Sequence, residues 1–305
     1  MGFFFAHASL KNPHFTLAFS LRLGYLTFPA TGGNRGRNSF VARLGRTLAP
    51  RRGLPVYVAC SSLCFSRFPL PQALYAIGEL RFQKVDLALH EAGTHLKPSE
   101  VKADVTRVAA ILKKANLSYA AFHVETDAVG ETFHDTLKAV CRLGRLVACP
   151  LVNIPAAPLG TAVADEVKRL TQLSRIAKAE GVMLTIETHC QTVTADPKAA
   201  AELCRSVPAL GLTLDPSHYL VGQVAELDYD VLFPFVRHVR LRDSAPSQMQ
   251  VKVGQGRVEY AKIITGLERQ NYQRALCVDM RDGPGVDYPV DAEVRKLKYL
   301  LESMV

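Results

Sequence analysis

The stretch Leu214-Asp215-Pro216-Ser217-His218 decides the fold of this chain, together with two similar stretches. These are Thr185-Ile186-Glu187-Thr188-His189 and His238-Val239-Arg240-Leu241-Arg242-Asp243. In each one an apolar or β-branched run ends in ionisable residues. Parallel strands that deliver such residues at their carboxyl ends are typical of α/β barrels, which build their active sites there. The three stretches therefore predict charged side chains that converge on one mouth, and with them an enzyme that uses acid/base or metal chemistry.

From Val56 onward, short apolar runs alternate with amphipathic helical segments. We expect strands over residues 56–61, 84–90, 119–125, 146–153, 182–188, 211–215, 236–242 and 275–280. We expect helices over residues 99–115, 132–143, 162–180, 260–270 and 290–301, and another that begins at Pro197 with Asp196 as its N-cap. Eight such units match the size of a (β/α)8 TIM barrel, about 250 residues. An open doubly wound sheet is the alternative, but no Gly-x-Gly-x-x-Gly motif follows the first strand.

Residues 1–53 differ from the rest of the chain. Residues 1–55 hold eight of the 37 basic residues and none of the 28 acidic ones, so the remainder is nearly neutral. We expect a disordered basic extension at 1–53, either without a folded role or acting as an organellar transit peptide, followed by the barrel at 54–305. The neutral barrel argues against a nucleic-acid partner.

Composition also limits the setting of the protein. No run of 18 or more uninterrupted apolar residues occurs, so no membrane association is expected. The seven cysteines are scattered and form no Cys-x-x-Cys pair, which favours a reducing cytoplasmic location and core positions for most of them.

Glu187 and Asp215 form the sharpest candidate pair, because each follows a run without another charge. Hard oxygen ligands on neighbouring strands suit a divalent cation such as Mn²⁺, Mg²⁺ or Co²⁺. Asp279 follows the apolar run 275–278 in the last expected strand and closes the ring next to the first. We expect other polar residues near the strand ends and loops to bind substrate, namely His90, Glu125, Asn153, His189, His218, His238, Arg240, Arg242 and Lys252.

These residues resemble the sugar phosphate isomerase/epimerase family of the xylose isomerase-like TIM barrel superfamily. The resemblance is carried by 186–189, 194–197, 214–218, 238–243 and 253–260. It implies that Glu187 and Asp215 are metal ligands, that Asp279 takes the place of the family's last Glu as ligand and catalytic partner, and that His218 contacts substrate. Arg240 stands where the family has a metal-binding His, and an Arg has no lone pair for a metal.

The resemblance implies a sugar or sugar phosphate substrate and proton transfer beside its carbonyl. Glu187 and Asp279 are the expected acid/base pair, assisted by the metal or by Arg240. A degenerate barrel that binds a sugar or metabolite without turnover is the main alternative. An endonuclease IV-like DNA repair enzyme of the same superfamily is less favoured, and a homo-oligomer is possible.

Overall fold

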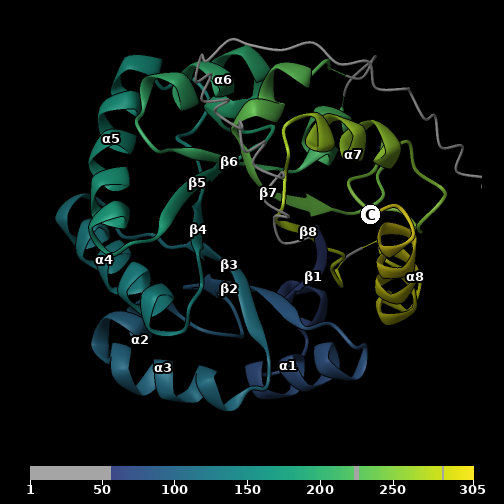
Figure 1. Ribbon diagram of the computed structural model, residues 1–305, viewed down its shortest axis with the longest axis horizontal. Helices are drawn as coiled ribbons and strands as arrows, with labels where there is room; N and C mark the ends of the chain where they lie inside the picture. The colour runs from purple at the N-terminus through teal and green to yellow at the C-terminus, as the bar shows by residue number, and fades with distance from the viewer. Residues whose placement is uncertain (1–55, 223–226, 284) are drawn as a thin grey trace, which may run out of the picture. The chain divides into compact units, whose positions relative to one another are not determined.

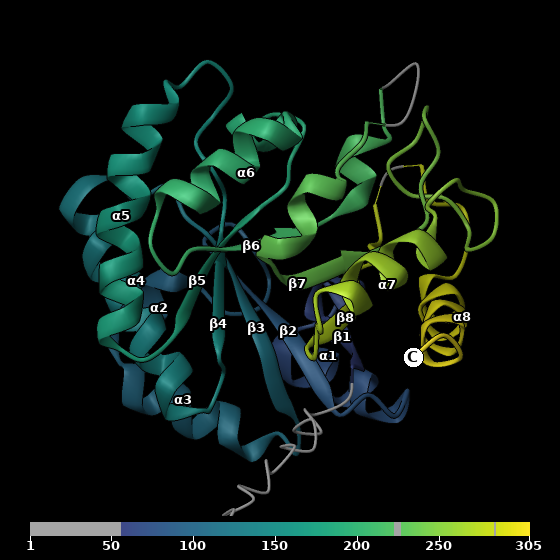
Figure 2. The ribbon, with the colours of Figure 1, turned by 45° about the horizontal axis from the view of Figure 1, so that its top comes forward.

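The structure is a computed structural model that describes residues 56–222, 227–283 and 285–305. The prediction of a disordered extension at 1–53 lies outside these residues. Eight parallel strands close into a barrel in sequence order, β1-β2-β3-β4-β5-β6-β7-β8, with helices packed outside (Figures 1 and 2). The strands are β1 Tyr57–Ser61, β2 Lys84–His90, β3 Ser118–Glu125, β4 Leu151–Ile154, β5 Met183–Glu187, β6 Gly211–Leu214, β7 Val236–Leu241 and β8 Ala275–Val278. The predicted fold class is confirmed.

The outer layer is made of α-helices that alternate with the strands. They are α1 Leu70–Glu79, α2 Pro98–Ala103, α3 Val105–Lys114, α4 Gly130–Leu146, α5 Val163–Ala179, α6 Pro197–Ser206, α7 Tyr260–Arg269 and α8 Val290–Glu302. Asp196 caps α6 as expected, because its side chain accepts the Lys198 N–H at 3.0 Å. Short 3-10 helices, η3 Pro216–Tyr219 and η4 Asp230–Phe235, lie between β6 and β7.

Three elements differ from the sequence prediction. Helix α1 is absent from that prediction, although Pro71 lies in its first turn, where the missing N–H costs nothing. The fourth strand begins at Leu151 rather than at residue 146, because Leu146 still belongs to α4. The helix expected over 99–115 is two helices that meet at Asp104, whose φ of −154° is not helical.

The interior of the barrel is unusually polar. Strand residues that point inward include Asp86, His123, Asn153, His238 and Arg240, each at most 1% exposed. The apolar core lies instead between the strands and the helices that cover them. Burial of ionisable groups is costly unless each is paired, so the inner residues must satisfy one another.

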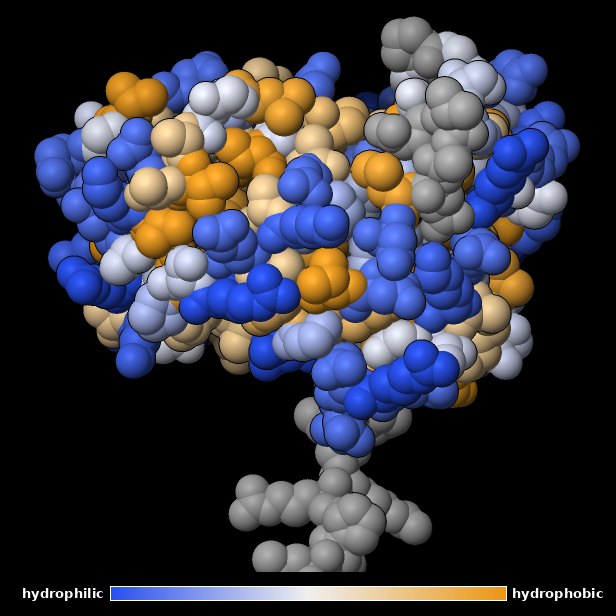
Figure 3. Space-filling view, turned by 90° about the horizontal axis from the view of Figure 1, so that it is seen from above, coloured by the Kyte–Doolittle hydropathy of each residue, from blue (hydrophilic) through white to orange (hydrophobic). Residues whose placement is uncertain are grey.

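The helices and one face of the surface can be described by their hydropathy. None of the helices in the described ranges combines the length and the hydropathy that a membrane-spanning helix needs. On the face drawn in Figure 3, hydrophilic residues cover large areas and apolar residues lie between them. The homo-oligomer stays a prediction.

The break between α2 and α3 gives a test of local helix stability. The Asp104 side chain accepts the Arg107 N–H at 2.9 Å and so caps α3. We expect Asp104→Ala to lower the free energy of unfolding by about 1 kcal/mol, the usual cost of losing an N-cap. Urea denaturation would measure it. Lys113→Ala, at an exposed position of the same helix, is the control, and an equal loss in both variants would contradict the capping role.

Candidate active site

Arg240 occupies the centre of the barrel. It projects from β7, is fully buried, and its guanidinium reaches carboxylates from three other strands. Nη1 lies 3.2 Å from Glu187 Oε1, Nη2 lies 3.0 Å from Asp279 Oδ1, and Nε lies 3.5 Å from Asp86 Oδ2. Nη2 also donates to Ser61 Oγ at 3.3 Å. One cation thus joins side chains of β1, β2 and β5 and the residue that directly follows β8.

A second arginine, Arg242, pairs with two of the buried acids closer to the mouth of the barrel. Arg242 Nη2 bonds to Asp215 Oδ2 and lies 3.0 Å from Asp279 Oδ2. Arg281 Nη2 approaches the same Asp279 oxygen, also at 3.0 Å. Asp279 therefore faces three guanidinium groups, while Asp215 Oδ1 accepts the Ser217 N–H. The predicted convergence of Glu187, Asp215 and Asp279 is real, and arginines lie between them.

The arginines keep the buried acids ionised. Burial alone raises the pKa of Asp86, but Arg240 and a hydrogen bond from His238 outweigh it and lower the pKa to about 2. For Asp279, burial is outweighed by Arg240, Arg281 and Arg242, which hold its pKa well below the ordinary value. These carboxylates are consequently poor proton acceptors while the arginines remain in place.

Further hydrogen bonds continue the network around the barrel. His123 Nδ1 accepts from Arg240 Nη1 at 2.7 Å and from Asn153 Nδ2 at 2.9 Å. Thr185 Oγ1 donates to Asn153 Oδ1, at 3.1 Å, and lies 2.8 Å from Thr213 Oγ1. Asn153, predicted to bind substrate, is buried inside this chain of hydrogen bonds and orients His123.

His238 lies deeper than Arg240 on the same face of β7, as the alternation of the strand predicts. Its Nε2 is 3.0 Å from Asp86 Oδ2, and the ring is only 1% exposed. In this position it supports Asp86 rather than reaching the mouth.

The ends of β2 and β3 form one rim of the mouth. His123 Nε2 lies 3.1 Å from Glu125 Oε1, and His90 Nδ1 lies 3.5 Å from Glu125 Oε2. The hydrogen bond from His123 lowers the pKa of Glu125 to about 2. Burial, with the nearby His123 second, lowers the pKa of His90 to about 3, so this imidazole is neutral. Two cavities of about 230 and 240 Å³ adjoin His90.

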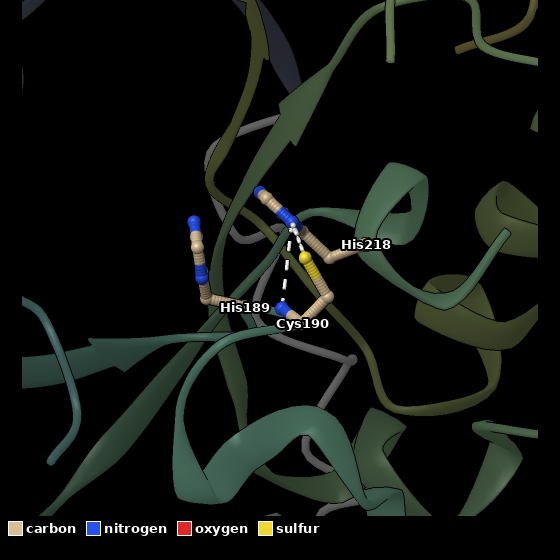
Figure 4. A group of neighbouring side chains, drawn as sticks. All are labelled: His189, Cys190 and His218. Atoms are coloured by element: carbon tan, nitrogen blue, oxygen red, sulfur yellow. Dashed lines mark hydrogen bonds between the residues drawn. The ribbon is translucent and has the colours of Figure 1, made fainter. Parts of the chain in front are cut away.

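The ends of β5 and β6 form another part of the mouth. His189 and His218 lie ring to ring, with centroids 4.1 Å apart, and Cys190 lies beside them (Figure 4). Burial lowers the pKa of His218, against an opposing effect of Asp215, whose Oδ2 is 3.8 Å from Nε2. Two of the four histidines predicted to bind substrate, His189 and His218, are therefore neighbours.

The glycine loop after β7 has its own partner. Asp243 Oδ2 accepts the N–H groups of Gly254 at 2.7 Å and of Gly256 at 3.0 Å. A Cβ at Gly256 would collide with Asp243 Oδ1, so the close approach requires glycine. These amides are not free for a phosphate. Lys252, predicted to bind substrate, stacks its ammonium on Tyr288 at 5.4 Å.

The predicted divalent metal does not fit the carboxylates at the barrel centre. Glu187, Asp215 and Asp279 each contact a guanidinium, and Arg240 stands between two of them. A cation introduced there would meet a fixed positive charge and would have to displace the arginine hydrogen bonds. Elsewhere in the described residues, three groups could hold a metal ion: His189 with Cys190 and His218, Asp86 with His238 and Cys277, and His90 with His123 and Glu125.

Sequence reasoning misses three residues of this site. Asp86 stands within a predicted strand, and its alternation with His90 on one face is a signal that could place it inside. Arg281 lies two residues after Asp279, and that spacing is a signal that could place both on one side. The sequence prediction places most cysteines in the core and does not single out Cys190, yet among the seven it alone is partly exposed.

A protein-family model matches most of the chain. The family model described as xylose isomerase-like TIM barrel matches residues 74–301, and the chain belongs to this family. No protein with a curated description matches the chain.

Solved structures share the fold at low sequence identity. D-allulose 3-epimerase from Methylomonas sp. superposes with a TM-score of 0.64 at 15% identity, over 83% of this chain and 98% of that one. A xylose isomerase-like TIM barrel protein from Mycobacterium smegmatis, in complex with magnesium, gives 0.63 at 15% identity, over 82% and 98%. The 3-keto-D-glucoside 4-epimerase YcjR from E. coli gives 0.59 at 12% identity, over 81% and 98%.

Arg240 and its partners Asp86, Glu187 and Asp279 form what we call the Arg240 cluster. We expect this cluster to dominate the stability of the barrel. We expect Arg240→Met to lower the free energy of unfolding by about 3–5 kcal/mol, because it leaves buried carboxylates without their cation. Lys168→Met is the control: it breaks the exposed pair with Asp165 and should cost about 0.5 kcal/mol or less. Chemical denaturation at neutral pH measures both, and equal losses would contradict the central role of Arg240.

The same cluster predicts an acid dependence of stability. A carboxyl whose pKa is lowered by folding stabilises the fold above its unfolded pKa, about 3.9, and this contribution is lost as the pH falls toward the folded pKa. For Asp86, that pKa is about 2. Unfolding free energy should thus fall as the pH drops from about 4 to about 2. In Arg240→Met the folded pKa rises and the fall should flatten; an unchanged slope would refute this explanation.

Proposed function

We propose that the protein is a sugar isomerase or epimerase in which Glu187 moves a proton beside the substrate carbonyl. The observation that carries the proposal is the position of Glu187. Its side chain is 10% exposed at the end of β5, while Asp215 and Asp279 are fully buried. It is therefore the acid of the central cluster that a ligand in the mouth can reach.

Positive charge beside Glu187 supports enediolate chemistry. A base that removes the proton next to a carbonyl needs a cation or donor near the oxygen that becomes charged. Arg240 is fully buried, so it positions Glu187 and does not contact substrate. Arg281, whose side chain is 38% exposed, is the guanidinium that a substrate oxygen can reach, and Asp279 holds it.

Glu187 is the accessible acid of the central cluster, and its position favours isomerisation over epimerisation. One carboxylate can move a proton between adjacent carbons on one face of an enediol, whereas epimerisation at one carbon needs exchange between two faces. Glu125, 51% exposed at the end of β3, is the other acid that could serve the second face. His189, His218 and the cavities beside His90 supply polar contacts for sugar hydroxyls.

Binding without turnover is the second candidate function. It is favoured by Asp279, the expected partner of Glu187, which is 0% exposed and bonded to three arginines. In that case the same pocket would recognise a sugar through its hydroxyls, and the arginines would serve only to stabilise the barrel.

Solvent exchange of substrate protons separates the two functions. The purified protein would be incubated in D₂O with a panel of ketoses, aldoses and their phosphates, and NMR would follow both product and deuterium next to the carbonyl. We expect turnover of one sugar class, reduced about 10²–10⁴-fold in Glu187→Gln. Glu131→Gln, at an exposed position on α4, should leave the rate unchanged.

The outcomes are distinct. Saturable binding of a sugar without product or exchange would favour the binding function. Turnover that is the same in Glu187→Gln as in the wild type would overturn the assignment of the base. Folding of each variant is checked by its thermal midpoint.

A further inference from the structure

Three side chains of types that can bind a metal meet at the mouth of the barrel, outside the Arg240 cluster. His189 and Cys190 come after β5, and His218 lies in η3 after β6. Figure 4 shows the two imidazole rings side by side and the thiol of Cys190 turned toward His218. One ligand atom from each residue lies within 4.8 Å of the other two.

The His218 ring is oriented as a metal-binding histidine would be, with one nitrogen toward the thiol and the other toward a carboxylate. Its Nδ1 faces the Cys190 sulfur at 3.4 Å, and its Nε2 faces Asp215 Oδ2 at 3.8 Å. A histidine that points one nitrogen at a metal commonly directs the other toward a carboxylate, which fixes the ring and raises its basicity. Asp215 is in turn held by Arg242, so the outer carboxylate has a fixed position.

Cys190 is set apart from the other cysteines. The remaining six are buried in the core, whereas Cys190 is partly exposed at the mouth. Its backbone N–H also points to His218 Nδ1, at 3.5 Å, so the loop holds the thiol and the imidazole together. His189 Nδ1 accepts the Gln191 N–H at 3.1 Å, which orients the second ring.

The other two groups are poorer sites. Asp86, His238 and Cys277 are all buried, and Asp86 contacts Arg240. In the group of His90, His123 and Glu125, the His123 ring already uses Nδ1 for two hydrogen bonds and Nε2 for Glu125. Of the three groups, the one with Cys190 alone combines a thiol with access from the mouth.

We propose that His189, Cys190 and His218 bind a borderline-soft divalent cation, Zn²⁺ in the first place. Imidazole and thiolate suit zinc, and ligand atoms of a tetrahedral site lie about 3.5 Å apart, so a closure of about 1 Å suffices. Three protein ligands leave a fourth position open to water or to an oxygen ligand. Metal binding releases the thiol proton to solvent. The site differs from the carboxylate site excluded by Arg240 and requires no turnover.

Cobalt and zinc titrations test the site on the full-length protein. We expect metal-free protein to bind one Co²⁺, with a sulfur-to-cobalt charge-transfer band and tetrahedral visible bands, both removed by Zn²⁺. Cys190→Ser should abolish the charge-transfer band, and His218→Asn should weaken zinc affinity at least about 10-fold. His134→Asn, on α4, is the control and should change neither.

Two further measurements show whether a bound metal lies at Cys190 or elsewhere. Zinc should protect one thiol from a thiol reagent in the wild type, and this protection should be absent in His218→Asn, whose fold is checked by its thermal midpoint. Loss of cobalt binding in His90→Asn but not in Cys190→Ser would place the metal at the β2/β3 rim and overturn the proposal. Absence of any bound Co²⁺ or Zn²⁺ would overturn it as well. Neither result depends on sugar turnover, so it leaves the isomerase proposal intact.

Discussion

The barrel depends on one buried guanidinium. Arg240 sits where carboxylates from β2, β5 and β8 converge, and without a cation these acids could not all stay ionised in a protein interior. It supplies the positive charge as part of the polypeptide chain. The fixed geometry of a guanidinium also sets which oxygen each acid offers, so the central layer has a defined arrangement of hydrogen bonds.

This arrangement separates the acids by accessibility. Asp215 and Asp279 are buried and held by arginines, while Glu187 keeps part of its side chain at the mouth. The chain belongs to the xylose isomerase-like TIM barrel family, and it shares its fold with solved sugar epimerases at 12–15% identity. At the centre of this barrel, a cation built into β7 lies among the acids.

The barrel fold and the meeting of its acids at one end could be predicted from the sequence. Parallel strands share one carboxyl edge, so Glu187, Asp215 and Asp279 were expected to converge, and alternation placed His238 below Arg240. The partners of these residues could not be predicted, because pairing of Arg240 with Asp86 joins residues that are distant in sequence. The break at Asp104 escapes prediction because helical periodicity runs on through it.

The loop after β7 shows how a strand can anchor the segment that leaves it. Asp243 holds Gly254 and Gly256 through their amides, with glycine required where the carboxylate comes closest. The loop is therefore tied to the strand and behaves as an extension of the rigid scaffold. Evolution of a new specificity would accordingly have to proceed through the other loops around the mouth, since length changes between Asp243 and Gly256 would break this clamp.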